Sequence, residues 1–143
     1  VYQDTLQFSM KKRPIAIPYL ETAPYPRFPT DMQSIVMAVL TIADGNSCIC
    51  EKIFENRMGV VDSLKTMGAQ IVNSKTMAKI QGVSHLTAGN VIATDLRSGA
   101  ALVVAGLGAK GITVIDGYEH IARGYEDIRR DLTKLGGKEW MVE

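Results

Sequence analysis

The sequence predicts an α/β fold in which sheets pack around buried helices. Short β-type runs alternate regularly with helix-type runs between Gly and Pro residues. Thr-Asp-Met-Gln at residues 30–33 recurs as Thr-Asp-Leu-Arg at residues 94–97, which indicates two copies of one supersecondary unit. The segment 99–109 is apolar on every side, as in a helix that other elements enclose. These observations favour one partial domain over residues 1–143, because neither copy is large enough to close a core alone.

The first repeat unit, about residues 15–89, is expected to contain two helices and a β-hairpin. Thr30 and Gln33 have the Thr-x-x-Gln spacing of a capping box, so the first helix is expected to begin at Thr30. The expected elements are, in order, an extended segment at 15–25, a helix at 30–45, a strand at 47–54, a helix at 56–68 and hairpin strands at 69–73 and 77–83.

The second repeat unit, about residues 90–143, follows the same pattern but is truncated. Its expected elements are a strand at 91–94, a helix at 95–109, a strand at 112–116, a helix at 124–135 and a last strand at 138–142. No hairpin partner follows that last strand. We therefore expect an unpaired sheet edge near residues 138–143. Because exposed edges recruit other chains, either self-association through this edge or a disordered C-terminus should follow.

Composition argues against two classes of partner. Lys and Arg together number 16 and Asp and Glu 15, so the net charge of +1 creates no basic field for a nucleic acid backbone. The longest apolar run, residues 99–109, is shorter than the ~20 residues needed to span a bilayer. The N-terminal residues lack the charged-then-apolar profile of a signal peptide. We therefore expect a cytoplasmic protein with no nucleic-acid or membrane partner.

The Cys and His residues predict neither a metal site nor a cofactor. Cys48 and Cys50 alternate along an expected strand, so their side chains point to opposite faces and are poorly placed for a disulfide. We interpret both as reduced thiols. His85 and His120 stand alone, without further Cys or His at the spacing of metal ligands.

Charged residues gather at the expected helix starts. Asp31 and Asp95 fall in first turns, Arg57 and Arg123 begin two other helices, and Arg97 follows Asp95. A helix N-terminus carries about half a positive charge, so Asp is favoured there and Arg is locally unfavourable. A bound anion would offset this unfavourable placement of the Arg residues. The Arg side chains and the helix N–H groups together could form a binding site for phosphate or carboxylate. The alternative is that the Asp residues are ordinary caps and the Arg residues solvated charges.

Five separated motifs resemble, in order and spacing, the C-terminal third of the UDP-N-acetylglucosamine enolpyruvyl transferases. They are Ala-Pro-Tyr-Pro at 23–26, Phe-Pro-Thr-Asp-Met-Gln at 28–33, Ile-Phe-Glu-Asn-Arg at 53–57, Ala-Thr-Asp-Leu-Arg at 93–97, and His-Ile with Arg-Gly-Tyr-Glu within 120–126. The resemblance implies an inside-out α/β barrel of repeated units with helices enclosed by sheets. It also implies transfer of the enolpyruvyl group of phosphoenolpyruvate to the 3-hydroxyl of UDP-N-acetylglucosamine, with release of phosphate, as the first committed step of peptidoglycan synthesis.

The resemblance also assigns roles to particular residues of this sequence. It implies that one carboxylate handles the proton of the sugar hydroxyl, that one backbone group contacts the nucleotide sugar, that three arginines surround the phosphate and carboxylate of phosphoenolpyruvate, and that a second carboxylate completes the site. These residues are, in that order, Asp31; Ile53; Arg57, Arg97 and Arg123; and Asp95. The family's other catalytic parts lie upstream of the motifs, so this segment alone is expected to be inactive.

Two alternative functions remain open at this point. The sister reaction transfers the enolpyruvyl group to shikimate 3-phosphate and uses a similar arginine-rich pocket, although the motifs at 28–33 and 93–97 favour the amino-sugar acceptor. The other alternative is a non-catalytic folding module that keeps a vestigial anion site. Binding of phosphate by the segment would test that last interpretation.

Overall fold

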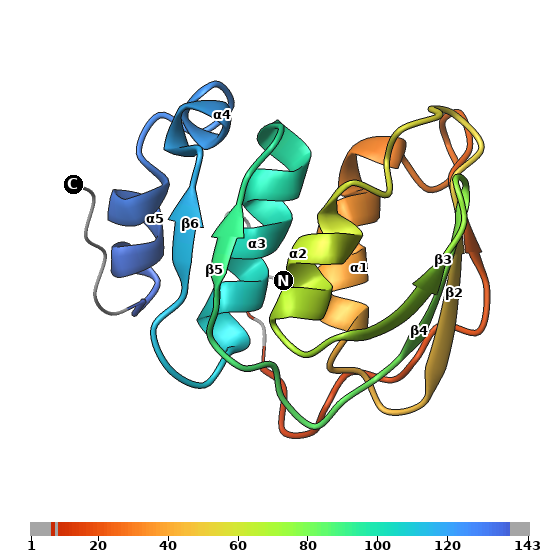
Figure 1. Ribbon diagram of the computed structural model, residues 1–143, viewed down its shortest axis with the longest axis horizontal. Helices are drawn as coiled ribbons and strands as arrows, with labels where there is room; N and C mark the ends of the chain where they lie inside the picture. The colour runs from red at the N-terminus through yellow and green to blue at the C-terminus, as the bar shows by residue number, and fades with distance from the viewer. Residues whose placement is uncertain (1–6, 8, 138–143) are drawn as a thin grey trace.

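A computed structural model describes residue 7 and residues 9–137, and it places α1 (Gln33–Leu40), α2 (Val60–Thr66) and α3 (Leu96–Gly108) between two sheets (Figure 1). A 3-10 turn, η1 (Thr30–Met32), leads into α1. The remaining elements are the strands β1 (Leu20–Glu21), β2 (Asn46–Cys50), β3 (Gln70–Asn73), β4 (Met77–Gln81), β5 (Asn90–Ile92) and β6 (Val114–Asp116), and the helices α4 (Tyr118–Ala122) and α5 (Ile128–Lys134). The expected class, α/β with helices enclosed by sheets, is confirmed.

The larger sheet has four strands in the order β1-β2-β4-β3. Its β3–β4 pair is the expected hairpin, and β4 also pairs antiparallel with β2, where Cys48 lies opposite Lys79. Cys48 is half-buried, Cys50 is buried, and both are free thiols. The smaller sheet contains the parallel pair β5–β6.

The same strand–helix–strand order occurs at both places where the sequence repeats. β1 and β2 are parallel and are joined through α1, and β5 and β6 are parallel and are joined through α3. Parallel neighbours require such a crossover, because a short hairpin can join only antiparallel strands. The boundaries of the two repeat units stay predictions.

Helix α3 is enclosed over residues 98–103, in line with the apolar pattern. These six consecutive residues are buried and exceed the 3.6 of one helical turn, so no face of this part is left to solvent, whereas Leu107 in the last turn is exposed. One side of α3 packs against α1 and α2 in the main core. Val103 of α3 also packs with Ala93 and Ile121 in a second, smaller cluster. The main core draws side chains from the four-stranded sheet and the three helices, including Met37, Leu40, Ile49, Leu64, Ile80 and Leu102.

The expected capping box at Thr30 and Gln33 is wrong. The Thr30 hydroxyl donates a hydrogen bond to the Glu51 carboxylate at 2.9 Å instead of accepting one from the helix backbone. Gln33 is fully buried, and its amide group contacts the Met58 sulfur and the Ser34 hydroxyl. The α-helix therefore begins only at Gln33, after the 3-10 turn.

Several further boundaries differ from the expected ones, and the first helix ends at Leu40 rather than near residue 45. The strand ends at Cys50 and α2 begins at Val60, because the Glu51 carboxylate accepts the backbone N–H groups of Ile53 and Phe54 and turns the chain there. The helix expected at 124–135 is present as α5 but begins four residues later, at Ile128, where Asp127 caps it by accepting the N–H of Arg130. A separate short helix, α4, precedes it.

The strand expected at 138–142 and the sheet edge expected near 138–143 lie outside the described residues. Within residues 7 and 9–137, no helix is long and apolar enough to cross a membrane.

Candidate active site

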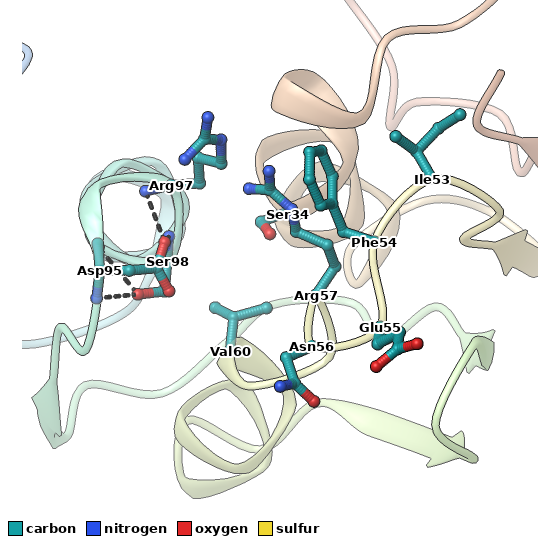
Figure 2. Close-up of a pocket in the computed structure, with 10 residues that line it drawn as sticks. All are labelled: Ser34, Ile53, Phe54, Glu55, Asn56, Arg57, Val60, Asp95, Arg97 and Ser98. Carbon is teal, nitrogen blue, oxygen red and sulfur yellow. Dashed lines mark hydrogen bonds between the residues drawn. The ribbon is translucent and has the colours of Figure 1, made fainter. Parts of the chain in front are cut away.

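A pocket of about 580 Å³ opens where the loop after β2 faces the start of α3. This volume lies in the range of ligand pockets, about 300–1,000 Å³. Figure 2 shows the guanidinium groups of Arg57 and Arg97 turned to the same side of the pocket, whereas Glu55 and Asn56 point away from it. The lining residues are Ser34, Ile53, Phe54, Glu55, Asn56, Arg57, Val60, Asp95, Arg97 and Ser98. Four of the six residues expected at the site, Ile53, Arg57, Asp95 and Arg97, are among them.

Asp31 joins the two arginines of the pocket. Its Oδ1 accepts the Arg97 Nε–H at 2.5 Å and lies 3.7 Å from an Arg57 terminal nitrogen. The Asp31 side chain is 65% exposed, so solvent screens this pairing, and one carboxylate does not neutralise two guanidinium groups. Asp31 does not line the pocket itself, but its carboxylate contacts the guanidinium groups of two residues that do. The expected meeting of Asp31, Arg57 and Arg97 is therefore present in the structure.

Arg57 is the more buried of the two arginines. Its side chain is 12% exposed, and its guanidinium lies over the Phe54 ring, 4.6 Å from the ring centroid. A guanidinium at this distance is attracted by the negative face of the ring. We expected Arg57 to begin α2. In the structure it lies three positions before α2, in the loop. Its orientation therefore depends on Phe54 and Asp31.

Asp95 caps α3. Its Oδ1 accepts the N–H groups of Arg97 at 2.8 Å and Ser98 at 3.1 Å, and the Ser98 hydroxyl accepts the Asp95 N–H, which completes a capping box. Partial burial raises the pKa of the Asp95 carboxyl, but the bonds from Ser98 and Arg97 and the charge of Arg57 outweigh it and hold that pKa below its ordinary value. Asp95 is therefore ionised at neutral pH, and the Asp-x-x-Ser spacing at 95–98 is the signal that could have predicted Ser98.

Arg123 does not lie at a helix start. It is the C-cap of α4, where a positive charge is favoured rather than unfavourable, so the helix-dipole argument for an anion does not apply to it. Arg123 is exposed and does not line the pocket. The next residue, Gly124, approaches Leu96 so closely that an added Cβ would lie 2.7 Å from Leu96 Cδ1. The chain thus carries Arg123 close to the segment that holds Asp95 and Arg97.

Glu51 is the functional candidate that the sequence analysis missed. Its side chain is buried and accepts four hydrogen bonds, two of them from the N–H groups of Ile53 and Phe54 at 2.8 and 3.1 Å. Burial raises the pKa of the Glu51 carboxyl, but these four bonds together lower it below the ordinary value. A carboxylate directly after a strand was the only signal available, and it does not reveal the partners.

The chemistry available to the pocket is recognition of an anion beside an exposed carboxylate. Two guanidinium groups can bind phosphate or carboxylate through paired N–H donors. Asp31 lies against both and can accept a proton from a hydroxyl bound there. Within the described part of the chain, no three His, Cys, Asp or Glu side chains come together as a metal cluster.

The sequence matches a family described as EPSP synthase (3-phosphoshikimate 1-carboxyvinyltransferase) over residues 2–132. UDP-N-acetylglucosamine 1-carboxyvinyltransferase 2 of Caldanaerobacter subterraneus subsp. tengcongensis is 47% identical over 133 residues, which are 93% of this chain and 32% of that protein. UDP-N-acetylglucosamine 1-carboxyvinyltransferase of Thermotoga petrophila is 46% identical over 143 residues, 100% of this chain and 34% of that protein. The crystal structure of the enolpyruvyl transferase NikO from Streptomyces tendae matches with a TM-score of 0.78 at 29% identity, over 88% of this chain and 29% of that one. This chain spans about a third of the length of these curated relatives.

Proposed function

This chain belongs to the EPSP synthase family, and we propose that it supplies part of the active site of an enzyme that transfers the enolpyruvyl group of phosphoenolpyruvate to the 3-hydroxyl of UDP-N-acetylglucosamine. In the net reaction a C–O bond forms between the sugar oxygen and C2 of phosphoenolpyruvate, the bond from C2 to the phosphate oxygen breaks, and the hydroxyl proton is released with phosphate. This transfer is the first committed step of peptidoglycan synthesis.

The observation that carries the proposal is the Asp31 carboxylate held against Arg57 and Arg97 at the pocket. Phosphoenolpyruvate has two anionic groups, and its binding would occupy the guanidinium groups that Asp31 now contacts. Asp31 would then be free to accept the proton of the sugar hydroxyl. Arg123 would add a third guanidinium to the bound anion.

Two further residues complete the proposed site. Asp95 stays ionised, so it would not supply a proton. Its carboxylate would instead place a fixed negative charge at the site and hold the Arg97 backbone by a hydrogen bond. Ile53 would contact the nucleotide sugar through its backbone. Its N–H already donates to Glu51, so the carbonyl is the group left to make that contact.

The acceptor decides between the two carboxyvinyl transfers. The family description names 3-phosphoshikimate, whereas the two relatives described above, at 46–47% identity, are named for UDP-N-acetylglucosamine. A full-length protein that carries this chain should release phosphate from phosphoenolpyruvate with UDP-N-acetylglucosamine and not with shikimate 3-phosphate. Release with shikimate 3-phosphate alone would reverse the assignment, and release with neither acceptor would favour the non-catalytic module.

The arginine assignment is tested with the same assay. Arg97→Ala removes a charge-assisted contact of about 1.5–3 kcal/mol, so the KM for phosphoenolpyruvate should rise about ten- to a hundredfold. Arg97→Lys should restore this only in part, because a point charge cannot replace a planar fork. Arg130, exposed on α5 and outside the pocket, is the matched control. An equal KM in Arg97→Ala and Arg130→Ala would return Arg97 to the role of a solvated charge.

A further inference from the structure

Glu51 connects three segments that meet beside the pocket. Its Oε1 accepts the Thr22 hydroxyl at 2.7 Å and the N–H groups of Ile53 and Phe54, and its Oε2 accepts the Thr30 hydroxyl at 2.9 Å. Thr22 follows β1, Thr30 begins η1, and Ile53 and Phe54 belong to the loop after β2. One side chain therefore holds together three pieces of backbone that are distant in the sequence.

The Glu51 carboxylate is 1% exposed and forms no ion pair among the described residues. A buried charge without a cation is costly unless hydrogen bonds replace the lost water. Four donors meet that requirement here, each on a different residue. An apolar side chain would fill the same space without that cost, so packing alone does not account for a carboxylate at this position.

The groups that Glu51 holds lead directly to the proposed catalytic residues. Thr30 is bonded to one carboxylate oxygen and immediately precedes Asp31. Phe54 is bonded to the other oxygen, and its ring lies under the Arg57 guanidinium. Through these two connections, Glu51 spans the distance between the backbone that carries Asp31 and the loop that carries Arg57.

We propose that Glu51 is a positioning residue that sets the spacing between Asp31 and the loop 53–57. This inference rests on the proposed function, because its consequence is the placement of a proton acceptor relative to the bound anion. Misplacement of a reacting group by about 1 Å can cost about a hundredfold in rate. The two threonines allow the positioning role to be separated from a structural one.

Thr30→Val and Thr22→Val each remove one hydroxyl donor from Glu51 and keep the shape of the side chain. Thr22 also accepts the Lys52 N–H at 2.9 Å, so Thr22→Val should destabilise the full-length protein at least as much as Thr30→Val. Only Thr30 connects Glu51 to Asp31. We expect Thr30→Val to lower kcat about tenfold or more and Thr22→Val less than about threefold, with thermal midpoints measured for both.

Thr30→Ser, which keeps the hydroxyl, should restore kcat, and Glu51→Gln should lower kcat more than it raises the KM for phosphoenolpyruvate. A kcat loss that follows the thermal midpoints, with Thr22→Val at least as impaired as Thr30→Val, would overturn the positioning role and leave the proposed function intact. Absence of phosphate release in the unsubstituted full-length protein would instead overturn the proposed function, and the role of Glu51 with it.

Discussion

At the scale of single residues, Asp31 is placed to respond to what occupies the pocket. It contacts Arg57 and Arg97 through the same oxygen, Oδ1. A bound dianion would compete with Asp31 for both guanidinium groups. It would free the Asp31 carboxylate only if the arginines pair more favourably with the dianion than with Asp31. Because Asp31 is largely exposed, its own pairs are weak and their loss costs little.

Asp31→Asn should therefore separate binding from turnover. The amide keeps the shape of the side chain but cannot accept a proton, so kcat should fall about 10²–10⁴-fold, the usual contribution of a general base. The KM for phosphoenolpyruvate should stay the same or fall, because Arg57 and Arg97 lose a competing anion. Steady-state kinetics of the full-length protein measures both parameters.

The matched control for this prediction is Asp62→Asn on the exposed side of α2, which should leave kcat and KM unchanged. Full activity in Asp31→Asn would remove Asp31 from the mechanism. A KM that rises together with the loss of kcat would show that Asp31 holds the substrate rather than its proton.

The residues of this site were predictable to different degrees. Asp31, Arg57, Asp95 and Arg97 lie within motifs, so their chemical type and order in the sequence were enough to single them out. The role of Thr30 was not predictable, because its hydroxyl had two possible partners, the helix backbone and the Glu51 carboxylate. Only tertiary structure decides between partners that lie close in sequence and partners that lie far away.

At the scale of elements, α3 supports the site by a capped N-terminus and a buried body. Asp95 and Ser98 fix the first turn, and close packing fixes the rest. Gly99 lies one position after the capping box, and a Cβ built there would be 2.5 Å from Ile121 Cγ1 and 3.2 Å from Ala93 Cβ. The glycine permits α3 to approach α4 and Ala93, the residue after β5, closely.

Gly99→Ala should destabilise the protein although Ala is the better helix former. The gain in helix propensity is about 1 kcal/mol, whereas overpacking a buried site costs about 1–3 kcal/mol. Gly108→Ala is the control, because its nearest neighbour would be Ile42 Cδ1 at 3.9 Å and only the propensity gain applies. Urea unfolding of the full-length protein should give a lower midpoint for Gly99→Ala and an equal or higher one for Gly108→Ala. The reverse order would contradict the packing argument.

Element positions were predictable where the apolar pattern was long and regular. The enclosed helix at 95–109 and the hairpin after residue 68 emerged from periodicity and turn residues alone. The helix expected at 124–135 begins only at Ile128, because Gly124 meets Leu96 and Asp127 caps α5, so the chain turns between them. This late start depends on a contact with α3, which a local pattern does not contain.

At the scale of the whole molecule, two carboxylates with lowered pKa values hold separate parts of the fold. Glu51 joins the segments around β1, η1 and the loop after β2, and Asp95 caps α3. Both pKa values are lower in the folded protein than in the unfolded chain, since the hydrogen bonds that lower them exist only in the fold. Their charged forms therefore stabilise the folded state above the ordinary carboxyl pKa of about 4.

This linkage predicts acid-sensitive stability for the protein. As the pH falls below about 4.5, the unfolded chain takes up protons before the folded protein does, so the free energy of unfolding should decrease. Urea midpoints of the full-length protein, measured between about pH 3 and 7, should fall steeply at the acid end. Glu51→Gln and Asp95→Asn should each be less stable at neutral pH and lose less on acidification, because each variant removes one of the groups that titrates. A double variant as acid-sensitive as the unsubstituted protein would assign the pH dependence to other carboxylates.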